Sequence, residues 1–146
     1  MKVYVTTSYD YSYCDDDFYN SYYSFVFGKV VESIDSSGHE VIAKSSLRPH
    51  ARDNANAIHS LLEQADVMVA FITGPSINVG LEIGTFVSRH KTPRTIVIYD
   101  KRKHCETFPE YMLIGDQRIT LIAYRDLDGI EPLLRGFLDD IVSDLS

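Results

Sequence analysis

Short apolar segments that alternate with longer amphipathic segments constrain the fold of this chain more than any other feature. The clearest is Val67–Thr73, which is apolar almost throughout and is typical of a central strand covered on both faces. Strand-like segments are also found at 2–7, 40–43, 94–99 and 118–124. Helical patterns occupy approximately 17–34, 53–64, 78–89 and 129–145. This order predicts parallel strands joined by right-handed crossovers.

Five such strands predict a doubly wound, flavodoxin-like or Rossmann-like α/β sheet with the strand order 2-1-3-4-5, in a single domain that spans residues 1–146. The length suits one domain, and 45% hydrophobic with 24% charged residues is a globular composition. The longest apolar stretch is too short to span a bilayer. Since Met1 leads directly into a strand pattern, we expect a cytoplasmic protein with no membrane partner.

Charge and cysteine content narrow the classes of function. The net charge is −7, with 14 basic and 21 acidic residues, which argues against a surface for a nucleic-acid polymer. Cys14 and Cys105 lie far apart without C-x-x-C spacing, so neither a disulfide framework nor a structural zinc site is expected. His104 beside Cys105 lacks further ligands nearby in the sequence. We therefore expect no metal and no cofactor.

In a doubly wound sheet, the ligand crevice lies at the carboxyl ends of strands one and three. Residues 8–10 and 74–82 follow those two strands, so Glu82 is expected at the mouth of the crevice, near the start of a helix. Gly80 and Gly84 flank it and leave the backbone bare, so that a ligand can approach closely. Ser76 and Asn78 are short hydrogen-bonding side chains near the helix start.

Two interpretations of this segment stay open on the residues alone. In the first, Glu82 complements the helix dipole, while Ser76 or Asn78 caps the helix. In the second, Ser76 and Asn78 bind an anion together with the free N–H groups, and Glu82 acts as a nucleophile or base in glycosidic chemistry.

Three pieces of sequence carry a family resemblance. They are the strand region Gln64–Phe71 (QADVMVAF), the turn Pro75-Ser76 and the segment 80–84 (GLEIG). Together they resemble the nucleoside 2-deoxyribosyltransferase superfamily, most of all its 2′-deoxynucleoside 5′-phosphate N-glycosidases and CMP hydrolases. The order of elements is similar over essentially the whole chain, and the specific motifs lie in this central block.

The resemblance implies an N-glycosidase or N-deoxyribosyltransferase that acts on a small nucleoside or nucleotide without a cofactor. Glu82 would attack C1′ of the sugar and displace the base, and Tyr4 would orient its carboxylate. Ser76 would bind a 5′-phosphate, and Ser8, Asp10, Asn78 and Gly80 would also line the ligand. Members of the family form homodimers whose sites share residues, so a homodimer or higher homo-oligomer is expected.

The sequence departs from the family pattern at three positions. Ile58 stands where the family usually has an aspartate, Asp10 where its nucleotide hydrolases carry an arginine, and Glu110 where a partner serine reaches the phosphate. The two acidic residues disfavour a 5′-monophosphate. Because the leaving base needs a proton, and a general acid contributes about 10²–10⁴-fold, Asp10 and His59 become the candidate proton donors.

These departures leave two alternatives to the leading hypothesis. Ile58 favours a catalytically silent module that binds or senses a nucleotide, and a related NAD or cyclic-nucleotide glycohydrolase would use a similar glutamate.

Two further segments have open interpretations. Tyr9 or Tyr11 is a candidate to cover the ligand by stacking on its base. The helical spacing of other aromatic residues is typical of packing on the sheet or on another subunit, namely Phe18, Tyr19, Tyr22, Tyr23 and Phe25. Arg48, His50 and Arg52 are expected in a solvated loop, or in contact with an anion.

Overall fold

The computed structural model describes residues 1–7, 17–43, 51–72, 77–90, 92, 94–100, 116–124 and 127–146, with side chains at all of these except 17–24, 43, 51–54, 77, 100 and 127. The strands are β1 Lys2–Thr7, β2 Glu40–Ala43, β3 Val67–Ile72, β4 Thr95–Asp100 and β5 Ile119–Tyr124. The helices are α1 Asp17–Ser36, α2 Ala51–Gln64, α3 Ile77–Arg89, the 3₁₀ turn η2 Leu127–Gly129, and α5 Ile130–Leu145.

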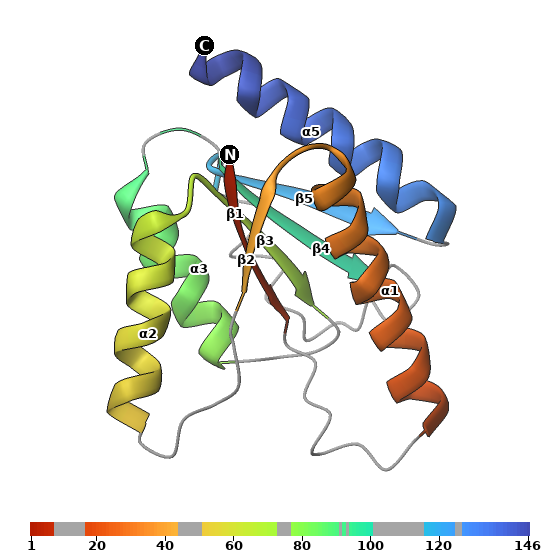
Figure 1. Cartoon of the computed structure of the whole chain (residues 1–146), viewed down its shortest axis with the longest axis horizontal. Coiled ribbons are helices and arrows are strands. Elements are labelled where there is room, and N and C mark those ends of the chain that lie inside the picture. Colours follow the sequence, from red (N-terminus) through yellow and green to blue (C-terminus); the bar gives the residue numbers. More distant parts are fainter. Residues whose placement is uncertain are drawn as a thin grey trace.

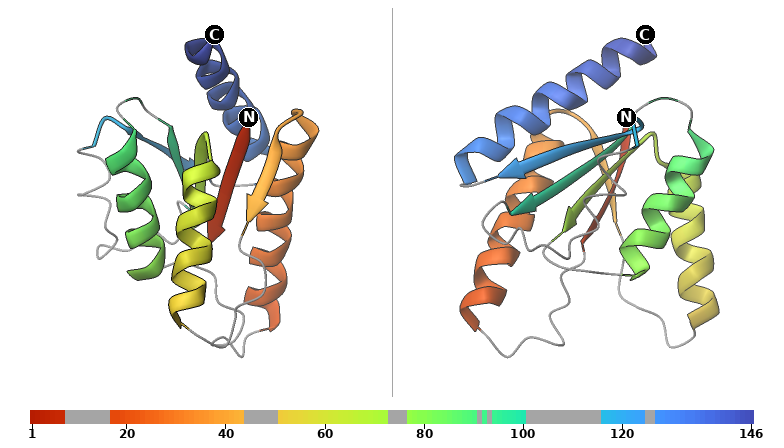
Figure 2. Two further views of the ribbon diagram at one scale, coloured as in Figure 1. Left: turned by 60° about the vertical axis from the view of Figure 1, so that its left-hand side comes forward. Right: turned by 180° about the vertical axis from the view of Figure 1, so that it is seen from behind.

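The five strands form one parallel sheet in the order β2-β1-β3-β4-β5, which confirms the predicted fold class and strand order. Helices α2 and α3 cover one face of the sheet, and α1 and α5 cover the other (Figures 1 and 2). The register pairs Tyr4 of β1 with Met68 of β3, and Val69 of β3 with Ile96 of β4. β3 is therefore central, as its continuous apolar sequence predicts.

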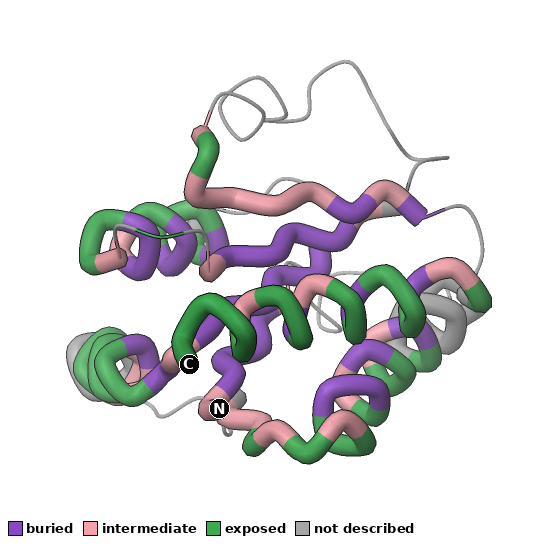
Figure 3. Tube along the Cα trace, turned by 90° about the horizontal axis from the view of Figure 1, so that it is seen from above, coloured by how far each residue is buried: buried purple, intermediate pink, exposed green. Residues whose placement is uncertain are grey.

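The two-residue period of the strands divides the apolar side chains into two cores. Val3, Val5 and Phe71 point toward α1 and α5, whereas Tyr4 and Met68 point toward α2 and α3. All six residues of β3 are buried, because helices cover both sides of this strand (Figure 3). The face that a strand residue occupies thus decides which helices it meets.

Helix bounds differ from the predicted ones by one or two residues, as is usual where helix ends fray. The end of α1 shows the physical reason. The helix was expected to stop near Ile34, but it continues to Ser36, and Gly38 then adopts a φ of 81°. The N–H of His39 bonds to the carbonyl of Ile34, and that of Gly38 to the carbonyl of Asp35, which together form a Schellman motif. Gly38 is thus the residue that ends the helix.

Asp66, in the motif before β3, ties that strand to the start of β1. Its carboxylate accepts the backbone N–H of Lys2 at 2.8 Å, and its own N–H donates to the carbonyl of Lys2 at 2.8 Å. The two contacts fix the register between β1 and β3, whose carboxyl ends border the predicted crevice.

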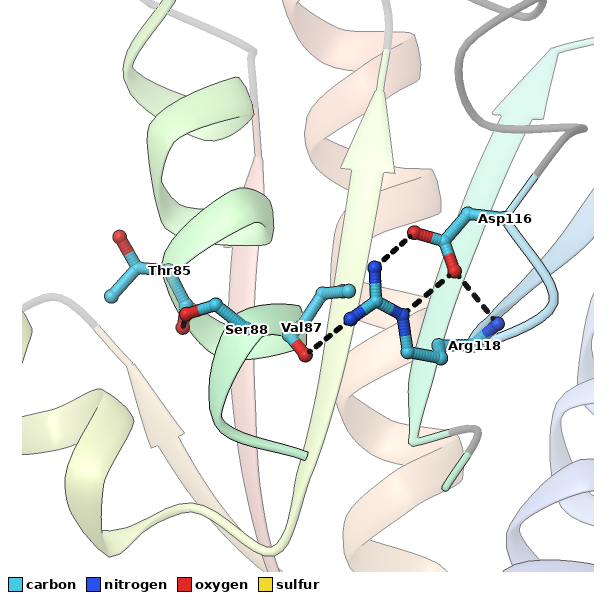
Figure 4. A network of polar contacts seen from close by, with 5 residues as sticks. All are labelled: Thr85, Val87, Ser88, Asp116 and Arg118. Carbon is cyan, nitrogen blue, oxygen red and sulfur yellow. Dashed lines mark hydrogen bonds and ion pairs between the residues drawn. The ribbon is translucent and has the colours of Figure 1, made fainter. Parts of the chain in front are cut away.

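Arg118, just before β5, holds the last turn of α3 (Figure 4). Its Nη1 donates at 3.2 Å to the carbonyl of Val87, which also accepts the N–H of His90 at 3.3 Å. The Asp116 carboxylate orients the guanidinium through contacts of 2.9 Å to Nε and 2.7 Å to Nη2. Within the same helix, the Ser88 hydroxyl donates to the carbonyl of Thr85 at 2.8 Å. This network anchors α3 at the end away from Glu82.

Asp116→Asn is expected to lower the thermal melting temperature at neutral pH. The side-chain and backbone hydrogen bonds from Arg118 lower the pKa of Asp116 from 3.8 to about 2. A lowered pKa in the folded state adds stability that is complete above the unfolded pKa and is lost as the pH falls through the folded one. The difference between wild type and variant should therefore narrow between pH 4 and pH 2 in a melting series. A constant difference over that range would contradict this role.

Candidate active site

The structure brings together Tyr4 and Glu82, which are 78 residues apart in the sequence. The Tyr4 hydroxyl donates to Oε2 of Glu82 at 3.1 Å. Both side chains are buried, Tyr4 at 0% and Glu82 at 4% relative exposure. The pair is therefore an interior polar contact between β1 and α3. Glutamates are usually found at the surface instead, in salt bridges or in exposed helix caps.

Local periodicity explains why these two side chains meet. Tyr4 lies on the face of β1 that is turned toward α2 and α3. Glu82 shares the inward face of α3 with Val79, Ile83 and Phe86, which are one turn or one residue away. Because α3 follows the carboxyl end of β3, its first turns start at that edge of the sheet. Glu82, the sixth residue of the helix, therefore lies within the sheet–helix layer near the predicted crevice.

The environment keeps Tyr4 as a neutral hydrogen-bond donor. Burial raises the pKa of Tyr4 well above its usual value of 10.0, and the charge of Glu82 and the hydrogen bond to it raise it further. The hydroxyl of Thr6 acts in the opposite direction, but the net pKa shift is upward. Tyr4 therefore keeps its proton and donates it toward Glu82 across the pH range in which proteins work.

The arrangement is suited to a carboxylate that attacks or accepts a proton. Tyr4 holds the carboxylate through Oε2, and the apolar neighbours Val79 and Ile83 limit water around it. A charge in such a place interacts strongly with a developing cation, because few solvent dipoles screen it.

The other predicted site residues have different placements. Asn78 and Gly80 are exposed in the first turns of α3, and a Cβ added at Gly80 would meet open space. His59 is exposed on α2, while Ile58 is half-buried and packs on the core beneath α2 and α3. The predictions for Ser8, Asp10 and Ser76 concern positions outside the described residues, as do those for Tyr9, Tyr11, Arg48, His50, Cys105 and Glu110.

Among the aromatic residues of α1 that were predicted to pack, Phe25 is the one whose side chain the structure describes. Phe25 is 54% exposed and does not pack on the sheet, whereas Phe27, which the prediction did not include, packs against Phe71 with ring centroids 6.4 Å apart. The side chains of Phe18, Tyr19, Tyr22 and Tyr23 lie outside the described part of the chain, as does that of Arg52. Packing of Phe25 on the sheet is thus wrong, and for the other four aromatic residues packing on the sheet or on another subunit stays a prediction.

Thr6 belongs to the same polar group, and the sequence analysis missed it. It lies two residues after Tyr4 on the same face of β1 and is 2% exposed. The signal in the sequence was the strand period, which places residues 4 and 6 on one side. A threonine in a strand is common, so the period alone gave no reason to select it.

None of the described clusters of His, Cys, Asp and Glu has three or more members placed to hold a metal ion. Among the helices of the described ranges, none is long and apolar enough to cross a membrane.

A hollow of about 350 Å³ lies between α1 and the start of α5, where Phe25, Lys29 and Ser33 line it. That hollow is on the face of the sheet opposite Glu82.

Comparisons with known proteins place the fold. No protein-family model matches the sequence, and no curated protein matches it. Among solved structures, the CMP N-glycosidase BcmB of Clostridium botulinum is similar with a TM-score of 0.62 and 14% identity, over 92% of this chain and 98% of that one. A 2-deoxyribosyltransferase from Bacillus psychrosaccharolyticus is similar with a TM-score of 0.55 and 12% identity, over 90% of each chain. The chain shares the fold of these two enzymes.

Proposed function

We propose that this protein is an N-glycosidase or N-deoxyribosyltransferase that cleaves the bond between base and sugar in a nucleoside or nucleotide. The observation that carries the proposal is the buried hydrogen bond from Tyr4 to Glu82 at 3.1 Å. A buried carboxylate with a fixed orientation is what nucleophilic attack on a sugar requires. The fold shared with a CMP N-glycosidase and a 2-deoxyribosyltransferase supports the same class of reaction.

The reaction has two steps in this proposal. First, a carboxylate oxygen of Glu82 attacks C1′, the C1′–N bond breaks, and its electron pair leaves with the base. The base takes up a proton, for which Asp10 and His59 are the candidate donors. In the second step, water or a second base attacks C1′ and releases the Glu82 carboxylate, and the proton that the attacking group loses returns to the donor of the first step. The result is hydrolysis or transfer. Tyr4 orients the carboxylate in both steps.

The proposal extends to the ligand-lining residues and to assembly. Ser8, Asp10, Ser76, Asn78 and Gly80 would contact the ligand, as the family resemblance implies. A homodimer or higher homo-oligomer is part of the same proposal. Sedimentation analysis checks it, and a monomer at every concentration would contradict it.

The direct test is release of free base from a panel of ribonucleosides, deoxyribonucleosides and their 5′-monophosphates. We expect release from at least one member, and none from that member with Glu82→Ala. Glu32→Gln is the matched control, because Glu32 is exposed on α1, on the other face of the sheet. Release from no member, or release that Glu82→Ala leaves unchanged, would refute the proposal.

Tyr4→Phe is expected to lower kcat by about 10- to 100-fold, the value of one hydrogen bond to a charged group. The substitution removes the donor to Oε2 and keeps the buried ring, so the core should remain packed. Steady-state kinetics on the substrate found in the panel measures the effect, and circular dichroism confirms folding. An unchanged kcat in a folded variant would show that Tyr4 does not orient the carboxylate.

The packing of Ile58 favours a second candidate function, which is ligand binding without turnover. Ile58 stands where the family has an aspartate, and it contributes an apolar contact to the α2–α3 core in place of a carboxylate. Such a module would be stabilised thermally by a nucleoside or nucleotide that it never cleaves. Melting curves with ligand, compared with base release from the same sample, distinguish the two functions.

A further inference from the structure

The hydroxyl of Thr6 is a buried polar group without a hydrogen-bond partner among the described residues. Its Oγ1 is inaccessible to solvent, and the residue is 2% exposed. Nearly all buried hydroxyls in folded proteins have a partner, and exceptions need a physical reason. Thr6 Oγ1 thus has the capacity for a further hydrogen bond that no described residue takes up.

The position of Thr6 connects this hydroxyl with the candidate active site. Thr6 and Tyr4 project from the same face of β1, and Thr6 is the one nearer the carboxyl end. The Thr6 hydroxyl lowers the pKa of the Tyr4 phenol, and it makes no hydrogen bond of its own among the described residues. On the next strand its register partner is Ala70, whose methyl group offers no bond. Thr6 therefore stands beside the group that holds Glu82.

We propose that Thr6 Oγ1 binds a sugar hydroxyl on the face of the furanose opposite the base, and so contributes to sugar specificity. The inference rests on the proposed function. In a displacement at C1′, the carboxylate approaches from the face opposite the leaving base. The base, its proton donor and the incoming water then lie on the other side. A polar group beside the Tyr4–Glu82 pair consequently meets the sugar, where the 2′- and 3′-hydroxyls are the available partners.

The test compares Thr6→Val, which keeps the shape and removes the hydroxyl, with Thr6→Ser, which keeps the hydroxyl. Each is assayed on a ribonucleoside and on its 2′-deoxy and 3′-deoxy analogues. For sugars that carry the bonded hydroxyl, Thr6→Val should lower kcat/KM by about 3- to 10-fold, the value of one neutral hydrogen bond. For the analogue that lacks this hydroxyl, kcat/KM should not change. Thr6→Ser should retain the wild-type pattern.

Thr95→Val is the matched control for a buried threonine. Thr95 is also 2% exposed, but it lies at the first position of β4, at the opposite end of the sheet from the carboxyl edge. Thr95→Val should change kcat/KM by the same factor for all the sugars, or leave it unchanged for all of them. If Thr6→Val leaves kcat/KM unchanged for every sugar, or lowers it by one common factor for all of them, the assigned contact is wrong.

Binding measurements separate this inference from the proposed function. Glu82→Gln is titrated with the same nucleosides by calorimetry, alone and combined with Thr6→Val. If wild type cleaves nothing but the double variant loses affinity only for sugars with the hydroxyl, the contact stands and the glycosidase proposal fails. If cleavage occurs and Thr6→Val has no selective effect, the glycosidase proposal stands and the Thr6 contact is wrong. If no nucleoside is cleaved or bound, both are overturned.

Discussion

Glu82→Gln is expected to lower the rate of base release by on the order of 10⁴- to 10⁶-fold, the loss typical when a nucleophile is removed from a group of residues that act together. Glutamine has the same shape and still accepts the Tyr4 hydrogen bond through its carbonyl oxygen. It lacks the negative charge and does not form the ester with C1′. Single-turnover assays on the best substrate of the panel measure the loss, because they exclude product release.

Substrate affinity provides the internal control for Glu82→Gln. The dissociation constant should change far less than the rate, because the variant preserves size and hydrogen bonding in a buried position. Glu63→Gln provides an external control, since Glu63 is an exposed glutamate on α2 that forms an ion pair with Arg89 at 3.6 Å. A decrease of less than tenfold for Glu82→Gln would assign the chemistry to a different residue.

Phe71→Ala is expected to lower the free energy of unfolding by about 3–5 kcal/mol. Phe71 is 0% exposed on the central strand, and its ring stacks on Tyr124 with centroids 6.0 Å apart. The ring of Phe27 on α1 also packs against Phe71, with centroids 6.4 Å apart. Truncation to alanine removes these contacts and leaves a cavity that strands on both sides prevent from collapsing. Urea denaturation followed by circular dichroism measures the change.

Phe25→Ala is the matched control for the core substitution. Phe25 is 54% exposed on α1, so its truncation should cost well under half as much as that of Phe71. Equal losses in the two variants would show that the core between the sheet and α1 is arranged differently.

Most of the fold could be predicted because its signals are local and repeated. The continuous apolar run of β3 indicated a strand covered on both faces, and the alternation of elements indicated parallel order. The ends of the helices were less predictable, since they depend on capping bonds such as those that Gly38 and His39 make with the last turn of α1. Phe25 and Phe27 show a similar limit, because helical spacing alone did not decide which aromatic residue faces the sheet.

The candidate site was predictable in part, and for a different reason. Glu82 was selected by its position after the central strand and then by the family resemblance, and Tyr4 by the resemblance alone. The structure shows that the two side chains are joined by a hydrogen bond. Their catalytic roles remain a proposal. Thr6 was missed because its significance depends on the absence of a hydrogen-bond partner among the described residues. Such a property exists only in three dimensions, after every neighbour has been placed.

The measurement that tests the central claim most directly is mass spectrometry of the protein after rapid quenching with its substrate. If Glu82 attacks C1′, the intact mass should increase by one sugar unit, and fragmentation should locate that sugar on Glu82. The adduct should be absent in Glu82→Gln and should disappear as the reaction is completed. A sugar attached to a different residue, or full base release without any adduct at the earliest quench times, would contradict Glu82 as the nucleophile.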